Sequence, residues 1–206
     1  MISIWVLAGL TLLGFTLSVM GWPNIEMTAD MLTLPSLDHW LGTDILGQDV
    51  FLRLLAGLPN TLLIAMFCGL LPIIMGFILA SISIISRYYV SRFLQKFVEV
   101  FLLIPSLLPL MLLAAVLEPG LVAVILLISV LSWPDDFKVL RSAILRVIQS
   151  DAILTARHFG ANNLYIMSNY VWPTIKPLLI MLFLQNARHA VMMSAGLAFL
   201  GLTDPR

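Results

Sequence analysis

Charged side chains are scarce in this chain. They make up 11% of its 206 residues, whereas an average soluble domain carries roughly a quarter. Because 61% of the residues are hydrophobic, a soluble fold of this length would lack the polar surface that water requires. The 11 basic and 11 acidic residues cancel, and the absence of a basic excess argues against binding of nucleic acid. The composition therefore predicts a protein that lies in lipid.

Cysteine and the common nucleotide- and metal-binding patterns are also rare or missing. The single cysteine, Cys68, permits no internal disulfide and no cysteine-based metal cluster. The sequence has no Gly-x-x-x-x-Gly-Lys-[Ser/Thr] phosphate loop, so we expect any ATP hydrolysis to occur on a separate chain. His39 follows Asp38, but a metal needs several converging ligands. We therefore predict no metal site, no cofactor and no enzymatic activity.

Long apolar runs dominate what is present. A helix needs about 20 mainly apolar residues to cross the hydrocarbon core. The runs that approach this length cover residues 2–21, 61–85, 97–117, 121–133 and 177–202. Backbone in lipid must satisfy its own hydrogen bonds, and the runs lack the alternation of barrel strands. The sequence therefore predicts an all-α, polytopic membrane helix bundle with five transmembrane helices, the fourth of them short. Residues 1–22 are expected to be a retained anchor rather than a signal peptide.

The basic residues predict the orientation of these helices. Eight of the eleven Lys and Arg lie in residues 86–96 and 134–176, and cytoplasmic loops carry the excess of such residues. We therefore expect both segments in the cytoplasm, an N-terminus that is also cytoplasmic, and residues 23–59 on the outer side of the cytoplasmic (inner) membrane.

The inner segment 134–172 has the pattern of a compact helical projection. Pro134, followed by two acidic residues, indicates the start of a helix. Further helices are predicted over 151–159 and 164–171, on either side of Gly160. Glycine adopts positive φ without steric cost and suits a sharp turn there. The alternative is a plain solvated connection between two transmembrane helices.

Several motifs give the chain a family resemblance. The inner segment reads Leu154-Thr155-Ala156-Arg157-His158-Phe159-Gly160, with Pro173 thirteen residues after the glycine. The outer segment reads His39-Trp40-Leu41-Gly42-Thr43-Asp44-Ile45-Leu46-Gly47-Gln48-Asp49-Val50. Further matches are Ile104-Pro105-Ser106, Trp133-Pro134, Arg141 and Ala198-Phe199-Leu200-Gly201-Leu202. Over residues 38–202 the chain resembles permease subunits of binding-protein-dependent ABC importers, of the dipeptide, oligopeptide and nickel group. Leu154, Thr155, Trp40 and Gln48 depart from the family's usual Glu, Ala, Pro and Arg.

The resemblance implies a function and a set of partners. It implies a translocation path for peptides or for nickel and other metal chelates. The chain would then consist of an N-terminal anchor (residues 1–22), an outer segment (23–59) and the transmembrane domain of an ABC importer (60–206). The resemblance implies that an ABC ATPase subunit, a second permease subunit and an extracytoplasmic substrate-binding protein are the partners, within membrane lipid. The residues it implies for ATPase coupling, through a cytoplasmic helix-turn-helix loop over 134–172, are Asp151, Ala156, Arg157, Gly160 and Pro173. Those of the outer motif are His39, Gly42, Thr43, Asp44, Gly47 and Asp49. The family has six transmembrane helices, so we expect a permease without its last helix, either an incomplete chain or a shortened and inactive form.

Three ionisable residues near or within the apolar runs are candidates for the translocation path. Arg188 and His189 lie about twelve residues into the last run, where ionisable side chains are costly and commonly functional. Glu99 lies near the cytoplasmic end of the run 97–117, a helix that Pro105 and Pro109 should kink. The alternatives are hydrogen bonding between helices for Arg188 and His189, and an ion pair with Lys96 or Arg92 for Glu99.

Thr43 or Asp44 is expected to cap a helix that starts near Ile45.

Two other classes of function compete with the importer subunit. A membrane enzyme would need a convergent acid, base or metal set, whereas His39, His158 and His189 are dispersed along the chain. A secondary transporter commonly shows internal repeats and acidic residues at mid-membrane. The sequence shows no repeat, and we expect no acid in the middle of a transmembrane helix.

Overall fold

The computed structural model describes residues 31–117 and 120–200. The predicted anchor over 1–22, the start of the outer segment and residues 201–202 of the last motif lie outside these ranges. Two compact units divide the chain between Leu63 and Ile64. Among the described residues there is no β-strand, and the one isolated bridge joins Thr43 to Asp49.

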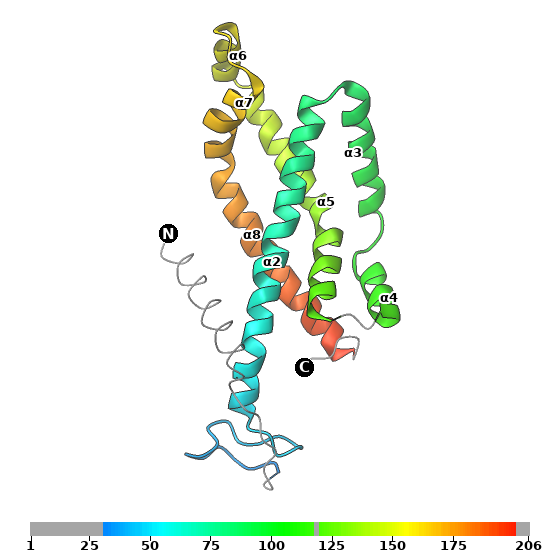
Figure 1. Cartoon of the computed structure of the whole chain (residues 1–206), viewed down its shortest axis with the longest axis vertical. Helices are drawn as coiled ribbons and strands as arrows, with labels where there is room; N and C mark the ends of the chain where they lie inside the picture. The colour runs from blue at the N-terminus through cyan, green and yellow to red at the C-terminus, as the bar shows by residue number, and fades with distance from the viewer. Residues whose placement is uncertain (1–30, 118–119, 201–206) are drawn as a thin grey trace. The chain divides into compact units, whose positions relative to one another are not determined.

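Helices account for most of the described chain (Figure 1). They are α2 (Val50–Ile85), α3 (Tyr88–Leu102), α4 (Leu107–Leu117), α5 (Leu121–Ile148), α6 (Asp151–His158), α7 (Asn163–Ile166), the π-helix η1 (Met167–Val171) and α8 (Trp172–Phe199). The helical class predicted from the sequence is thus confirmed for the described residues.

Two helical segments in the described ranges are long and apolar enough to cross a membrane, α2 and the continuous stretch Asn163–Phe199. Helices α3 and α4 make a third if this bent pair forms one span. The apolar run 61–85 lies inside α2, which starts eleven residues earlier, and most of the run 177–202 lies in α8. The structure therefore gives two to three candidate spans among the residues it describes.

The predicted run 97–117 is not one helix. Helix α3 ends at Leu102, and α4 turns by 75° from it after a break that contains Pro105. Proline lacks an N–H and disfavours helical backbone in the residue before it, which explains the break. Pro109 does not break α4, because it lies in the first turn, where a missing N–H costs little.

The prediction that a helix starts at Pro134 is wrong. Helix α5 runs without interruption from Leu121 to Ile148, with Pro134 inside it and buried. A membrane bundle tolerates an internal proline where neighbouring groups satisfy the freed backbone. Two residues before the proline, the hydroxyl of Ser132 donates to the carbonyl of Ile128, within the same helix, at 2.8 Å. The buried rings of Trp133 and Phe137 also hold α5 in the core on either side of Pro134.

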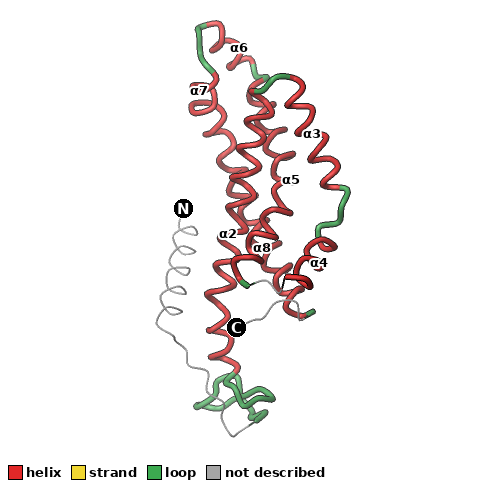
Figure 2. The backbone as a smooth tube through the Cα atoms, turned by 45° about the vertical axis from the view of Figure 1, so that its right-hand side comes forward, coloured by secondary structure: helices red, strands yellow, loops and turns green. Residues whose placement is uncertain are grey.

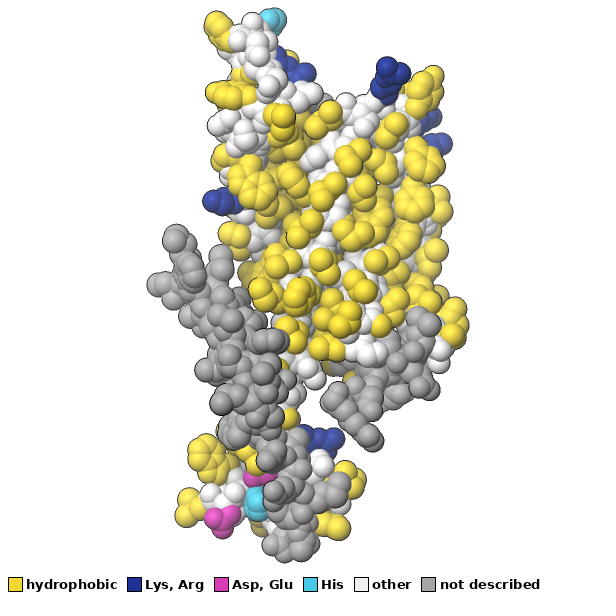
Figure 3. Space-filling view, in the orientation of Figure 1, with side chains coloured by type: hydrophobic (Ala, Val, Ile, Leu, Met, Phe, Trp, Pro, Cys, Tyr) yellow, Lys and Arg dark blue, Asp and Glu magenta, His cyan; other side chains and the backbone are white. Residues whose placement is uncertain are grey.

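The second unit has its core where α2, α5 and α8 pack together (Figure 2). One buried cluster is centred on Phe137, Leu140 and Ile144 of α5, packed with residues of α2 and α8. A second joins Cys68 of α2 to Leu110 of α4 and further residues of α5 and α8. Hydrophobic side chains also cover the outer face of these helices (Figure 3). A bundle that is apolar inside and outside is suited to lipid rather than water.

Candidate functional site

The segment after α5 folds into a projection, defined here as residues 151–173. Its first helix, α6, carries Asp151 in the first turn and Arg157 and His158 in the last, which complements the helix dipole. Gly160 follows with φ +86°, and its N–H donates to the carbonyl of Arg157 at 3.0 Å. A Cβ at Gly160 would meet nothing within 4 Å. The glycine is therefore required by the backbone conformation and not by a lack of space.

The second half of the projection is held by local side-chain bonds. The side chain of Asn162 caps α7, where its Oδ1 accepts the N–H of Tyr165 at 2.8 Å. Across the turn, Nη2 of Arg157 donates to Oδ1 of Asn163 at 3.4 Å. Ile153 and Ile166 are almost fully buried in the core cluster. These contacts give the turn one defined conformation.

The tip of the projection carries exposed apolar side chains that the sequence analysis did not single out. Phe159 is 89% exposed and Leu164 is 80% exposed. They flank the Gly160 turn: Phe159 is the C-cap of α6, and Leu164 lies on α7. Exposed apolar residues of this size beside a fixed turn are typical of a surface that another protein covers. In the sequence, the position of Phe159 and Leu164 directly beside the turn residues could have identified them as exposed.

The sequence predicts that the helix over residues 164–171 ends before Pro173, and this prediction is also wrong. The chain remains helical from Asn163 through η1 into α8, and Pro173 lies in the first turn of α8. The π-helical turn of η1 absorbs the change in backbone geometry ahead of it.

A buried polar pair links the helices of the core. Asp136, at the middle of α5, is 2% exposed, and its Oδ2 accepts a hydrogen bond from Nδ2 of Asn186 on α8 at 2.6 Å. Gly76 of α2 packs directly against Asp136 and Phe137. Asp136 lies outside the candidate spans among the described residues, so the absence of an acid from the middle of a transmembrane helix stays a prediction. The sequence pattern predicts Asp136 in the first turn of a helix, and the uninterrupted α5 places it in the core instead.

The structure does not bring the three predicted path residues together. Glu99 lies on α3, whereas Arg188 and His189 lie on α8, and all three side chains are exposed. Among the described residues Glu99 forms no ion pair with Lys96 or Arg92. It lines a cleft with basic residues of α5 instead. Their role in translocation stays a prediction.

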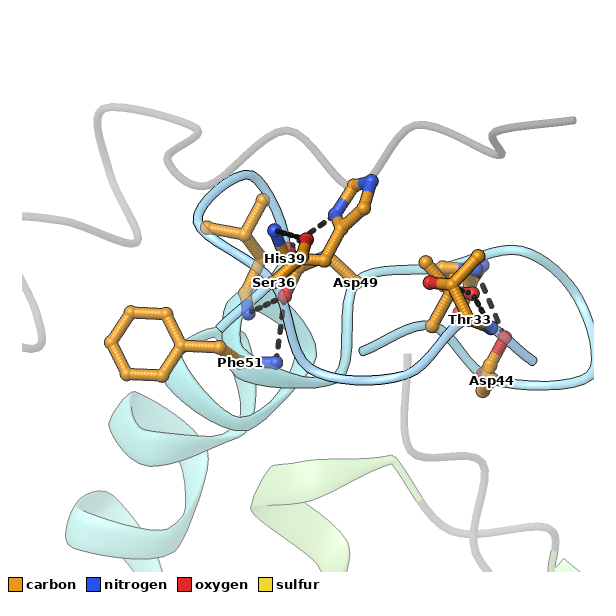
Figure 4. Close-up of polar contacts among 9 residues, drawn as sticks. Thr33, Ser36, His39, Asp44, Asp49 and Phe51 are labelled. Atoms are coloured by element: carbon orange, nitrogen blue, oxygen red, sulfur yellow. Dashed lines mark hydrogen bonds and ion pairs between the residues drawn. The ribbon is translucent and has the colours of Figure 1, made fainter. Parts of the chain in front are cut away.

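The outer motif forms a folded turn before α2, shown in Figure 4. Nδ1 of His39 lies 2.8 Å from Oδ2 of Asp49, and a carboxylate only accepts, so His39 donates. Oδ1 of Asp49 accepts the N–H groups of Phe51 at 2.8 Å and Leu52 at 3.2 Å. The N-terminal cap is therefore Asp49, ahead of a helix that starts at Val50, and the predicted cap at Thr43 or Asp44 is wrong.

The other members of the motif shape the loop. Oδ1 of Asp44 accepts the N–H groups of Leu46 at 2.8 Å and Gln48 at 3.0 Å, and its Oδ2 pairs with Arg53. These hydrogen bonds, that from Gln48 above all, lower the pKa of the Asp44 carboxyl. Gly42 and Gly47 both have positive φ, at +74° and +70°. Every polar bond described here joins parts of this segment to one another, which indicates a structural role.

Loss of the Asp49 cap should loosen the outer segment. The hydrogen bond from His39, followed by those from Leu52 and Phe51, lowers the pKa of the Asp49 carboxyl. The carboxylate therefore stabilises the segment above its ordinary pKa of about 4, and this is lost as the pH falls through the lowered value. Removal of a cap costs about 1 kcal/mol, so Asp49→Ala should speed limited proteolysis of residues 31–49 by roughly fivefold at neutral pH. Asp38→Ala, an exposed acid in the same loop, is the control. Equal cleavage rates of the two variants would contradict the capping role.

Comparison with known proteins gives the chain its relatives. The family described as "Binding-protein-dependent transport system inner membrane component" matches residues 72–205. A putative peptide permease protein of Brucella abortus is 29% identical over 184 residues, which cover 89% of this chain and 61% of the relative. The oligopeptide transport system permease protein OppC of Bacillus subtilis is 27% identical over 83% of this chain and 56% of its own length. The nickel transport system permease protein NikC of Escherichia coli K12 is 28% identical, over 86% and 64%.

The chain thus spans about three fifths of the length of these curated relatives. The matched family region contains residues 72–85 of α2 and all of α3 to α8, including the projection and the Asp136–Asn186 pair. A match over more than half of the chain decides its membership. This protein belongs to the family of inner membrane components of binding-protein-dependent transport systems.

Proposed function

We propose that the chain is a membrane-spanning permease subunit of an ABC importer and forms part of its translocation path. The observation that carries the proposal is the family match over residues 72–205, which includes the Gly160 projection. The names of its relatives support a cargo of peptides or of nickel and other metal chelates. The partners are a second permease subunit, ABC ATPase subunits and an extracytoplasmic substrate-binding protein.

The projection would transmit the ATPase cycle to the helices. Residues 151–163 dock in a cleft of the ATPase, with Phe159 and Leu164 as the apolar contacts at the tip. Ile153 and Ile166 join the projection to the core, so a force on the tip reaches α5 and α8. Closure of the ATPase would then shift the population between inward- and outward-facing states by a few kcal/mol. Asp151, Ala156, Arg157, Gly160 and Pro173 maintain the shape of this element.

The membrane topology that fits this function has five spans in the chain. Helices α2 and α8, the bent pair α3–α4 and the apolar first half of α5 supply four of them, and residues 1–22 the fifth. The N-terminus and residues 134–172 lie in the cytoplasm, and residues 23–59 lie outside. The distribution of Lys and Arg supports this orientation.

Purification of the tagged full-length chain from its native membrane tests the assembly. We expect it to co-purify with a second permease and with a subunit that contains a phosphate loop and hydrolyses ATP. An unrelated tagged membrane protein of similar size is the control. Recovery of the chain without any ATP-hydrolysing subunit, under conditions that retain a second permease, would argue against the importer.

A further inference from the structure

A second feature of the bundle is a basic cleft between α3 and α5. Its volume is about 420 Å³. Gln95 and Glu99 of α3 line one wall, and Lys138, Arg141, Ser142 and Arg146 of α5 line the other. The residues of α5 recur every three or four positions and therefore share one face of the helix. Neither the coupling projection nor the Asp136–Asn186 pair is part of this cleft.

The cleft has more positive than negative charge. Three cations face a single acid, Glu99. In the described ranges, none of these cations forms an ion pair with a carboxylate. Arg141 is half-buried, and the acceptors of its guanidinium among the described residues are two hydroxyls, that of Ser83 at 3.1 Å and that of Ser91 at 3.4 Å. A half-buried guanidinium that has only neutral acceptors favours an additional anion nearby.

Aromatic side chains lie beside the charged part of the cleft, where Phe137 and Trp133 are buried and Phe97 is exposed. Phe137 lines the cleft, and its ring lies 6.3 Å from that of Trp133. The ring of Trp133 in turn contacts those of Phe97 and Phe101 on α3. Phe97 is 47% exposed. A ligand in this cleft would therefore have cations at one end and aromatic rings beside them.

We propose that the α3–α5 cleft binds the headgroup of an anionic phospholipid, with an acyl chain along the aromatic rings. Basic pockets between membrane helices bind such headgroups, and Arg pairs well with phosphate oxygens. Figure 3 shows Lys and Arg side chains at the end of the unit where α2 ends and α3 begins. The inference depends on the membrane location of the family and not on the importer function.

Native mass spectrometry of the detergent-purified full chain tests this site with phosphatidylglycerol and phosphatidylcholine as probes. We expect the anionic lipid to be retained preferentially. The double variant Lys138→Gln/Arg146→Gln should lower its apparent affinity on the order of tenfold, because two cations near the phosphate are lost. The matched control is Arg87→Gln/Arg92→Gln, which removes the same charge from exposed positions outside the cleft lining.

A second variant gives an effect of opposite sign. Glu99→Gln removes the single acid of the cleft and should tighten binding of phosphatidylglycerol by a few-fold. If Lys138→Gln/Arg146→Gln and Arg87→Gln/Arg92→Gln lose the same affinity for phosphatidylglycerol, the attraction is non-specific and the proposal is overturned. Displacement of the lipid by inorganic phosphate at similar concentration would show a site for free phosphate, which also overturns it.

Discussion

Replacement of Gly160 by valine is expected to reduce ATP-driven uptake by about tenfold while leaving the protein folded. At φ +86° a β-branched residue is strained by roughly 1–2 kcal/mol, which corresponds to about a tenfold change in the population of the native turn. No atom lies within 4 Å of the new Cβ, so the core is not disturbed. The turn itself relaxes to another conformation, and Phe159 and Leu164 lose their relative placement.

The matched control is Gly160→Asn at the same position. Asparagine enters the left-handed region far more readily than valine, so this variant should retain most of the uptake and of the ATPase stimulation. Uptake into proteoliposomes and ATP hydrolysis by the assembled complex are the measurements. If Gly160→Val supports both at normal expression, the projection does not couple the ATPase to the membrane helices.

Gly76→Val is expected to lower the melting temperature of the bundle by about 5–10 °C. A Cβ at this position would lie 2.9 Å from the backbone nitrogen of Phe137 and 3.0 Å from Cβ of Asp136. Because backbone atoms cannot rotate away, α2 and α5 must separate, and overpacking of this kind costs typically 1–3 kcal/mol. The separation should also disturb the buried hydrogen bond between Asp136 and Asn186.

Cys68 provides the readout for this experiment. It is the single cysteine of the chain and is 1% exposed, so a thiol-reactive fluorophore reports unfolding in detergent. Gly196→Val on α8 is the matched control, since a Cβ at Gly196 meets nothing within 4 Å. Gly76→Val must melt well below Gly196→Val. Equal melting temperatures would show that α2 and α5 do not approach closely at Gly76.

Features that depend on local sequence could be predicted well. The apolar runs within α2 and α8 were recognised by length, and Pro105 does interrupt the chain between α3 and α4. Gly160 was expected at positive φ, which is what the structure shows. Each of these features follows from the physical properties of a few neighbouring residues, so one sequence was sufficient.

Features that depend on distant contacts could not be predicted. Pro134 looks like a helix start, yet packing of the neighbouring Trp133 and Phe137 keeps α5 continuous through it. Asp136 becomes a buried core residue only because Asn186, fifty positions later, donates to it. Asp49 caps α2, and the hydrogen bond between His39 and Asp49, ten residues apart in the preceding loop, holds its carboxylate. The family resemblance identified the function class, but it could not place Glu99, Arg188 and His189 relative to one another.

We propose above that this chain works as part of an ATP-driven importer. The direct measurement is uptake of radiolabelled dipeptide or nickel chelate into proteoliposomes that contain the purified complex and receive the binding protein outside. We expect uptake that requires ATP inside together with the ATPase subunit, and that stops when either is omitted. Uptake by this chain alone, driven by an ion gradient without ATP, would contradict it.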